Sequence, residues 1–289
     1  MKIIDILKED KVHISCELFP PKKGSQLETS KEIVAQMAAL RPSYMSVTYG
    51  ATGGTSDYTV DIANEIQNVN HIPALAHLTC ASSTKEKVEE VVKQLKEKKI
   101  ENILTLRGDI PEQTDFPLPN QYQYAYQLIH HVKSLGDFCI GGACYPEGHP
   151  EAATMDADLE HLKNKVDAGC DFLTTQLFYD NNIYYNFMYK VLKKGIDVPV
   201  IAGIMPVTNS NQLKRIISLS GNMVPPRFRH IVDCFYDNPA AMKQAGIAYA
   251  TEQIIDLIAN GVKNIHIYTM NHPDVAGQIF DNLSEIYTR

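Results

Sequence analysis

Short apolar runs rich in β-forming residues recur along this chain, and amphipathic stretches with helical spacing separate them. Runs that alternate with helices in this way are typical of parallel strands joined by crossover helices. Eight such units close into a (β/α)8 barrel, the TIM barrel. The runs expected to form its strands are residues 13–21, 44–49, 72–79, 102–109, 139–146, 172–178, 199–206 and 264–270.

The stretches between these runs predict the helices. A mostly helical region at 210–261 is long enough for one or two extra helices before the last strand. An open doubly wound sheet is the alternative, but no G-x-G-x-x-G motif follows an early run. Nothing in the composition marks a linker, so we expect one domain over 1–289. The predicted helices are 30–40, 58–69, 85–98, 123–135, 156–168, 183–194 and 239–259.

Composition excludes several classes of protein. A formal net charge of -7 argues against a broad nucleic-acid-binding face. Six cysteines without a C-x-x-C pair argue against a zinc knuckle and a dense disulfide framework, and suit a reducing cytosol. The charged start at 1–10 lacks a signal-peptide core, and no apolar run is long enough to span a bilayer. We expect a soluble cytoplasmic protein without a bound metal.

Polar residues fall at the same end of nearly every predicted strand. In a barrel, the carboxyl ends of the strands and the loops that follow them form the active site. Any one of these residues could be a structural hydrogen-bonding group, but together they predict a polar mouth for a large ligand. They are Glu17, Thr48, Tyr49, His77, Arg107, Asp109, Tyr145, Glu147, His149, Gln176, Asn209 and the segment 268–271.

Glu17 is the most informative of them, because it interrupts the apolar first run just before Pro20 and Pro21 end it. A carboxylate is costly to bury in its charged form without a purpose. The alternative to a functional role is a structural pair with a buried Lys or Arg.

Seven ordered blocks resemble the signature blocks of the methylenetetrahydrofolate reductase family. The resemblance covers essentially the whole chain, and it implies a flavoprotein barrel of the short bacterial type without a regulatory domain. The blocks are Glu-Leu-Phe-Pro-Pro (17–21), Ser-Val-Thr-Tyr-Gly-Ala (46–51), His-Leu-Thr-Cys (77–80), Leu-Arg-Gly-Asp (106–109), Ala-Cys-Tyr-Pro-Glu-Gly-His-Pro-Glu (143–151), Thr-Gln-Leu-Phe-Tyr-Asp (175–180) and Gly-Ile-Met-Pro-Val (203–207).

The resemblance implies reduction of 5,10-methylenetetrahydrofolate to 5-methyltetrahydrofolate, with NAD(P)H reducing FAD and reduced FAD then reducing the folate in ping-pong order. The bridging methylene becomes electrophilic once a proton reaches the departing nitrogen, which is general acid work. Glu17 matches the family's acid. Asp109 matches the family residue between flavin and folate, where its charge would favour a developing pterin cation. A turn with a local ion pair is the alternative for Arg107 to Asp109.

The resemblance also implies binding residues. Thr48 would lie near the nicotinamide, while Gln176, Gln212 and His272 would contact the folate. A solvated, salt-bridged helix face is the alternative for Asp158, His161 and Lys165, which are spaced for one face. The residues implied to bind FAD are Tyr49, Ala51, His77, Arg107, Gly108, Asp109, Ala125, Tyr145, His149, Ala152, Asp158, His161 and Lys165.

The chain departs from the family pattern at two positions. Ile216 falls where some relatives carry the phenylalanine that covers the nicotinamide, and His272 falls where some carry arginine. The choice between NADH and NADPH stays open, as do an electron-donating partner protein and the size of the homo-oligomer that we expect. Two other classes stay open: a barrel enzyme of pterin or one-carbon chemistry without flavin, such as a methyltransferase, and a noncatalytic binding or scaffold subunit.

Overall fold

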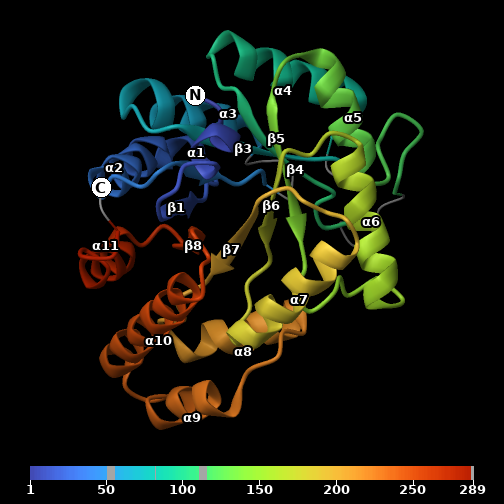
Figure 1. Cartoon of the computed structure of the whole chain (residues 1–289). Coiled ribbons are helices and arrows are strands. Elements are labelled where there is room, and N and C mark those ends of the chain that lie inside the picture. The colour runs from blue at the N-terminus through green and yellow to red at the C-terminus, as the bar shows by residue number, and fades with distance from the viewer. Residues whose placement is uncertain (51–55, 82, 111–115, 288–289) are drawn as a thin grey trace.

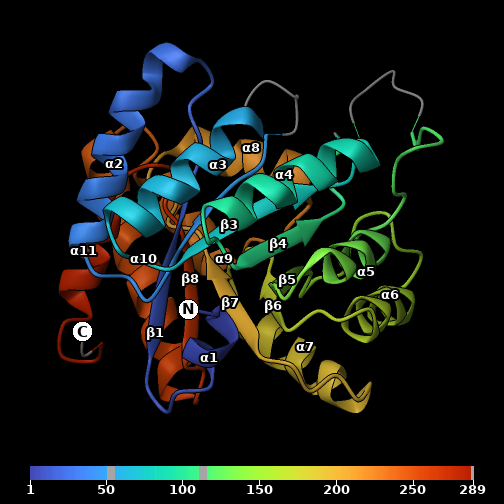
Figure 2. The same ribbon diagram turned by 90° about the horizontal axis from the view of Figure 1, so that it is seen from above.

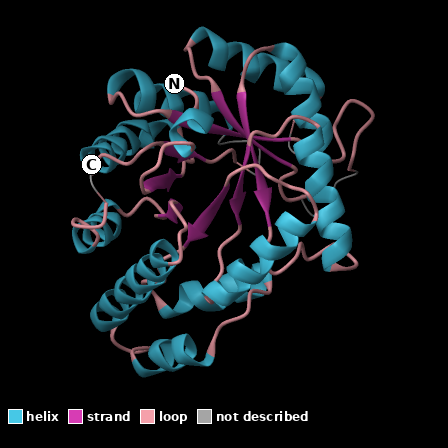
Figure 3. Cartoon of the chain, in the orientation of Figure 1, coloured by secondary structure: helices cyan, strands magenta, loops and turns pink. Residues whose placement is uncertain are grey.

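The computed structural model describes residues 1–50, 56–81, 83–110 and 116–287. Within them, eight parallel strands pair in chain order, and β8 pairs with β1 to close the barrel (Figure 3). The predicted TIM barrel is confirmed, and the open sheet is wrong because no strand is left at an edge in this part of the chain. The strands are β1 (His13–Leu18), β2 (Met45–Val47), β3 (Ala74–Thr79), β4 (Asn102–Leu106), β5 (Cys139–Cys144), β6 (Phe172–Thr175), β7 (Val200–Ile204) and β8 (Asn264–Tyr268).

Helices surround the barrel, as Figures 1 and 2 show from two sides. Three of them lie between β7 and β8, which confirms the extra helices predicted there. Three of the elements below, α1, η1 and α11, were not predicted. The helices are α1 (Ile3–Leu7), the 3-10 turn η1 (Gly24–Gln26), α2 (Leu27–Ala39), α3 (Ser56–Asn64), the π-helical η2 (Glu65–Val69), α4 (Lys85–Glu97), α5 (Ala125–Leu135), α6 (Met155–Asp167), α7 (Asn181–Lys193), α8 (Ser210–Ser220), α9 (Pro226–Cys234), α10 (Pro239–Ala259) and α11 (Pro273–Asn282).

Helix α4 shows how the sequence pattern forms these helices. The Thr84 side chain accepts a hydrogen bond from the backbone N–H of Lys87 and so caps the amino end. Val88, Val91 and Leu95 repeat at helical spacing and are buried, while the charged residues of the helix cover its other side. The apolar face packs on the barrel wall.

Several strands end earlier than predicted, for local backbone reasons. The last strand was expected to reach residue 270 but ends at Tyr268, because Met270 and Asn271 have φ of 53° and 59°, which a strand cannot adopt. The fourth was expected to reach residue 109 but ends at Leu106, two residues before Gly108 with φ of 81°. These turns bring the polar residues that follow the strands onto the mouth of the barrel.

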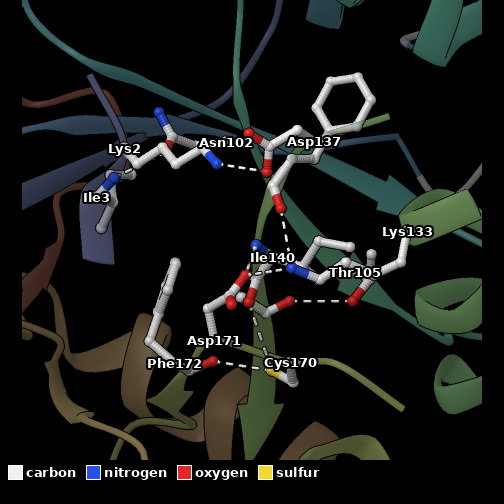
Figure 4. Close-up of polar contacts among 12 residues, drawn as sticks. Lys2, Ile3, Asn102, Thr105, Lys133, Asp137, Ile140, Cys170, Asp171 and Phe172 are labelled. Atoms are coloured by element: carbon white, nitrogen blue, oxygen red, sulfur yellow. Dashed lines mark hydrogen bonds and ion pairs between the residues drawn. The ribbon is translucent and has the colours of Figure 1, made fainter. Parts of the chain in front are cut away.

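The amino-terminal end of the barrel is covered by α1. The backbone N–H of Ile3 donates to Asn102 Oδ1 at 2.8 Å, and Lys2 pairs with Asp137 at 2.5 Å (Figure 4). Ile3 also packs into an apolar cluster with Leu104 and Phe172 inside this end. Polar and apolar contacts together hold α1 against the strand starts.

Candidate active site

A cavity of about 620 Å³ opens at the carboxyl ends of the strands. Most of the predicted site residues line it, although they come from strands, loops and helices spread over more than half of the chain. Those that line the cavity are Glu17, Thr48, Tyr49, His77, Arg107, Gly108, Asp109, Ala125, Tyr145, His149, Ala152, Asp158, His161, Lys165 and Gln176.

Glu17 lies late on β1 and is almost fully buried, yet its side chain reaches this cavity. Its Oε2 is 3.7 Å from Nε2 of His77 and 4.0 Å from Nε2 of His266. No Lys or Arg among the described residues is within ion-pair distance of the carboxyl. The alternative of a structural pair with a buried cation is therefore wrong within this part of the chain.

The side chain of His77 lies close to Glu17 but does not form a charged pair with it at neutral pH. Burial lowers the pKa of His77 to about 4, against the opposing effect of the Glu17 charge. The ring is therefore neutral at pH 7, and its buried Nε2 has no hydrogen-bond partner among the described residues. This nitrogen can bond to a polar group of a ligand in the cavity.

His266 lies under Glu17 on β8 and is held from both ring nitrogens. Nδ1 is 2.7 Å from the hydroxyl of Ser15, and Nε2 is 3.3 Å from the hydroxyl of Ser46. The ring of Tyr268 meets the imidazole edge-on, with the ring centres 5.3 Å apart. These contacts fix the floor of the cavity below the Glu17 carboxyl.

Arg107 follows β4 and forms a two-point ion pair with Glu151, at 2.5 and 2.6 Å. This hydrogen-bonded pair lowers the pKa of Glu151 and raises that of Arg107. The alternative of an ion pair within the 107–109 turn is wrong, because the guanidinium turns to Glu151 and leaves Asp109 exposed on the cavity. Gly108 is required here, since a Cβ would lie 3.0 Å from the Thr79 side chain at φ of 81°.

Asp158, His161 and Lys165 lie on the face of α6 that borders the cavity. Lys165 Nζ donates to the Ala143 carbonyl oxygen at 2.8 Å, and burial lowers its pKa. Asp158 accepts from the backbone N–H of His149 at 3.1 Å. The alternative of a solvated, salt-bridged face is wrong, because Lys165 points inward and its bond to Ala143 is with a backbone oxygen.

The loop after β5 contributes two rings to the cavity. Tyr145 and His149 pack edge to face with their centres 4.6 Å apart, and burial lowers the pKa of His149. Glu147, from the same loop, instead accepts hydrogen bonds from the Asn222 side chain at 2.9 Å and the Met223 backbone at 2.8 Å. It ties this loop to the segment between α8 and α9.

Known proteins resemble this chain over nearly its whole length. Residues 2–284 match the family described as methylenetetrahydrofolate reductase. The chain belongs to the methylenetetrahydrofolate reductase family. Methylenetetrahydrofolate reductase (NADH) 1 of Zea mays is 36% identical, and the match covers 99% of this chain and 50% of that protein. The 5,10-methylenetetrahydrofolate reductase of Pectobacterium carotovorum subsp. carotovorum is 34% identical, and the match covers 95% of this chain and 91% of that protein.

The chain therefore spans about half the length of the plant relatives and nearly all of the bacterial one. Among solved structures, an uncharacterized protein from Clostridium thermocellum, described as binding two copies of 5-methyl-5,6,7,8-tetrahydrofolic acid, superposes with a TM-score of 0.65 at 15% identity. That match covers 99% of this chain and 100% of the other. Dihydropteroate synthase from Xanthomonas albilineans superposes with a TM-score of 0.54 at 10% identity, over 96% and 93% of the two chains. At these identities the two structures show the fold alone.

Two residues that the reductase resemblance implied, Gln212 and His272, are not part of the cavity lining. Ala51 lies outside the described residues. Gln212, on α8, accepts a hydrogen bond from the backbone of Thr208 at 3.2 Å and is not part of the cavity lining. His272 is exposed at the start of α11, also outside the lining. The roles of Gln212 and His272 toward the folate and of Ala51 toward FAD stay predictions. Ile216, the position expected near the nicotinamide, packs against the apolar cluster under α8 and α9.

Sequence reasoning missed several residues that line the cavity of this reductase-family chain. They are aromatic or apolar, or they lie within strands, so the search for polar residues at strand ends did not find them. Glu151, by contrast, is charged and had a detectable signal, because its carboxylate comes two residues after His149. The missed residues include Phe19, Tyr124, Tyr126, Glu151, Met205 and His266.

In the described ranges no group of three His, Cys, Asp or Glu side chains could hold a metal ion.

Proposed function

We propose that this chain binds FAD at the barrel mouth and uses NAD(P)H to reduce 5,10-methylenetetrahydrofolate to 5-methyltetrahydrofolate. Membership of the reductase family and the names of its relatives support the reaction. The observation that carries the proposal is the shared cavity. Glu17 and the described residues implied to bind the cofactor line one space of about 620 Å³.

The residues around this space fit FAD. Lys165 keeps donors beyond its bond to Ala143 and can bind a phosphate or carbonyl oxygen. The unpartnered Nε2 of His77 can bond to a polar edge of the flavin ring. Gly108 brings backbone close to the cavity where a side chain would not fit. FAD, when bound, carries a hydride from the nicotinamide to the folate methylene carbon.

Glu17 has the position of a proton donor in this reaction. The methylene bridge of the folate opens when a proton reaches the departing nitrogen, and the Glu17 carboxyl is the acid that faces the cavity from β1. Neutral His77 and the fixed ring of His266 border it. Because neither neighbour holds a strong hydrogen bond to the carboxyl at 3.7 and 4.0 Å, Glu17 is able to donate toward the folate.

Asp109 and Gln176 face the same space from the segments that follow β4 and β6. The exposed Asp109 carboxylate would stabilise positive charge on the opened pterin. Gln176 Oε1 already accepts from the Leu177 backbone at 2.9 Å, which leaves its amide N–H groups for the pterin edge. Thr48 lines the cavity beside the end of β1 and would border the nicotinamide. One space used by two flat substrates in turn implies ping-pong kinetics.

Flavin spectroscopy tests this function. The purified chain is mixed anaerobically with NADH or NADPH, and 5,10-methylenetetrahydrofolate is then added. We expect bleaching of the flavin bands by one nicotinamide or both, and their return with the folate. A protein that stays colourless after addition of FAD would contradict the proposal and favour a pterin enzyme without flavin. Bound flavin that the folate does not reoxidise would favour a binding or scaffold subunit.

A further inference from the structure

Side-chain hydrogen bonds join the end of β1 to the turn that follows β8. Thr269 Oγ1 donates to the Glu17 carbonyl oxygen at 2.6 Å. The Asn271 side chain bonds to both backbone groups of Phe19. Its Oδ1 accepts from the Phe19 N–H at 2.8 Å, and its Nδ2 donates to the Phe19 carbonyl oxygen at 3.0 Å. We call this two-point contact the Asn271 clasp.

The clasp continues the pairing of β1 with β8 beyond the point where the strands end. Glu17 and Tyr268 are the last pair in register. Successive backbone carbonyls of a strand point to opposite neighbours, so the Leu18 carbonyl faces β2 and accepts from the Thr48 N–H at 3.0 Å. Phe19, the next residue, faces β8 again. There the side chain of Asn271 takes the place of a backbone partner.

The backbone of this turn has an uncommon conformation. Met270 and Asn271 have φ of 53° and 59°, and the His272 N–H donates to the Thr269 carbonyl at 3.0 Å, as in a type I′ turn. Gly, Asn and Asp dominate such turns, and a positive φ is unfavourable for Met. Unfavourable backbone conformations persist where neighbouring contacts hold them, often at active sites. The turn places the Asn271 amide beside Phe19.

The Glu17 carboxyl group depends on the backbone for its position. Its oxygen is 3.7 Å from His77 and 4.0 Å from His266, beyond the length of a strong hydrogen bond. The end of β1 therefore determines where the carboxyl lies. A proton donor has to be within hydrogen-bond reach of its acceptor, and a displacement of about 1 Å can slow a reaction about 10²-fold. Contacts that fix the end of β1 thus act on the acid.

We propose that Asn271 is a positioning residue for Glu17, because its clasp on Phe19 holds the end of β1 where the carboxyl can protonate the folate nitrogen. This inference rests on the proposed function, in which Glu17 is the acid. Asn271 is not part of the cavity lining, so it acts through the backbone of Phe19 and not by touching the reacting atoms.

Rapid mixing in the two half-reactions tests the inference in the wild type, Asn271→Gly, Glu17→Gln and the double variant. Glycine adopts a positive φ freely, so Asn271→Gly keeps the turn and removes only the amide. We expect reoxidation of the flavin by 5,10-methylenetetrahydrofolate to slow about tenfold to hundredfold, with flavin reduction by NAD(P)H unchanged. In the Glu17→Gln background, the same substitution should slow reoxidation by less than about twofold, because no proton donor remains to be misplaced.

Amide hydrogen exchange measures the clasp itself in the full chain freed of cofactor. Asn260 provides the matched control, because its amide also bonds to a backbone oxygen, that of Asp256 at 2.8 Å, at the end of α10 and before β8 begins. NMR should show the Phe19 N–H exchanging at least about tenfold faster in Asn271→Gly than in the wild type. In Asn260→Gly, the exchange of Phe19 and both half-reactions should match the wild type.

Three kinetic results would overturn the inference and leave the proposed function intact. They are an unchanged rate of reoxidation in Asn271→Gly, an equal loss in both half-reactions, and the same further loss in the Glu17→Gln background. Unchanged exchange of the Phe19 N–H would also overturn it. A wild type whose reduced flavin is not reoxidised by the folate would refute the proposed function itself, and this inference with it.

Discussion

At the scale of single residues, the cavity is defined by carboxyl groups with few cationic partners. Glu17 faces two histidines at 3.7 and 4.0 Å, and Asp109 is exposed beside an arginine that pairs elsewhere. A carboxyl group engaged in a strong ion pair would lose its chemical use as an acid or as a free charge. Because Arg107 is paired with Glu151, the Asp109 carboxylate remains a free charge on the cavity.

Asp109→Asn is predicted to slow the folate half-reaction. The substitution keeps the shape of the side chain but removes the negative charge that would favour the opened pterin cation, so we expect the rate to fall at least tenfold, about 1.4 kcal/mol in the barrier. Folate binding should weaken, and FAD should remain bound. Rapid mixing of the reduced flavoprotein with 5,10-methylenetetrahydrofolate measures the rate. An unchanged rate would remove Asp109 from the reaction.

His77 is predicted to make stability depend on pH. Its pKa is about 4 in the folded chain and ~6.5 when unfolded, so the unfolded chain binds more protons between these values. The contribution of neutral His77 to the free energy of unfolding is therefore complete above pH ~6.5. It is lost as the pH falls toward 4, by about 3 kcal/mol in total. Urea unfolding at several pH values should show a shallower pH dependence for His77→Asn than for the wild type. Identical slopes would contradict the assignment of a buried neutral ring.

At the scale of elements, close backbone contacts set how the helices sit on the barrel. Gly246 lies in the middle of α10, where a Cβ would come within 1.8 Å of the Val207 carbonyl oxygen after β7. Gly277 in α11 is different, because the nearest atom to its Cβ position is Leu40 Cδ2 at 3.7 Å. Two glycines inside helices thus have opposite packing environments.

Gly246→Ala is predicted to destabilise the fold and Gly277→Ala to leave it unchanged or improve it. The Gly246 substitution forces α10 away from the loop after β7 and lowers the free energy of unfolding by about 3 kcal/mol. The Gly277 substitution replaces a poor helix former by the best one and should raise the free energy of unfolding by at most ~1 kcal/mol. Chemical unfolding of the two variants measures both effects. Equal stabilities would contradict the close approach of α10 to Val207.

Elements differed in how well the sequence predicted them. Helices such as α4 were predicted because an apolar stripe of Val88, Val91 and Leu95 repeats over several turns. Strand ends were predicted too late, because a positive φ at Met270 or Asn271 is set by tertiary contacts and leaves no sign in hydropathy. The short α1 was missed for the same kind of reason, since Asn102, distant in sequence, holds its start.

At the scale of the whole molecule, the barrel could be predicted from alternation alone, and the site largely from ordered blocks of sequence. What the sequence could not show was which distant groups come together, such as Arg107 in an ion pair with Glu151, or Glu17 beside His77 and His266. The aromatic side chains at the rim were also missed, because an exposed tyrosine has no pattern that separates it from an ordinary surface residue.

Assembly and location of this reductase-family chain stay predictions. A homo-oligomer and a cytoplasmic setting were expected from the sequence, and so was a single domain. Of the helices in the described ranges, none has the length and apolar character needed to cross a membrane.

The central claim is that the barrel mouth combines a flavin with a proton donor on β1. Rapid mixing of Glu17→Gln in two separate half-reactions tests it most directly. We predict that NAD(P)H reduces the bound flavin of the variant at close to the wild-type rate, while its reoxidation by 5,10-methylenetetrahydrofolate slows by about 10² to 10⁴, the range for loss of a general acid. Wild-type reoxidation, or an equal loss in both half-reactions, would contradict the account.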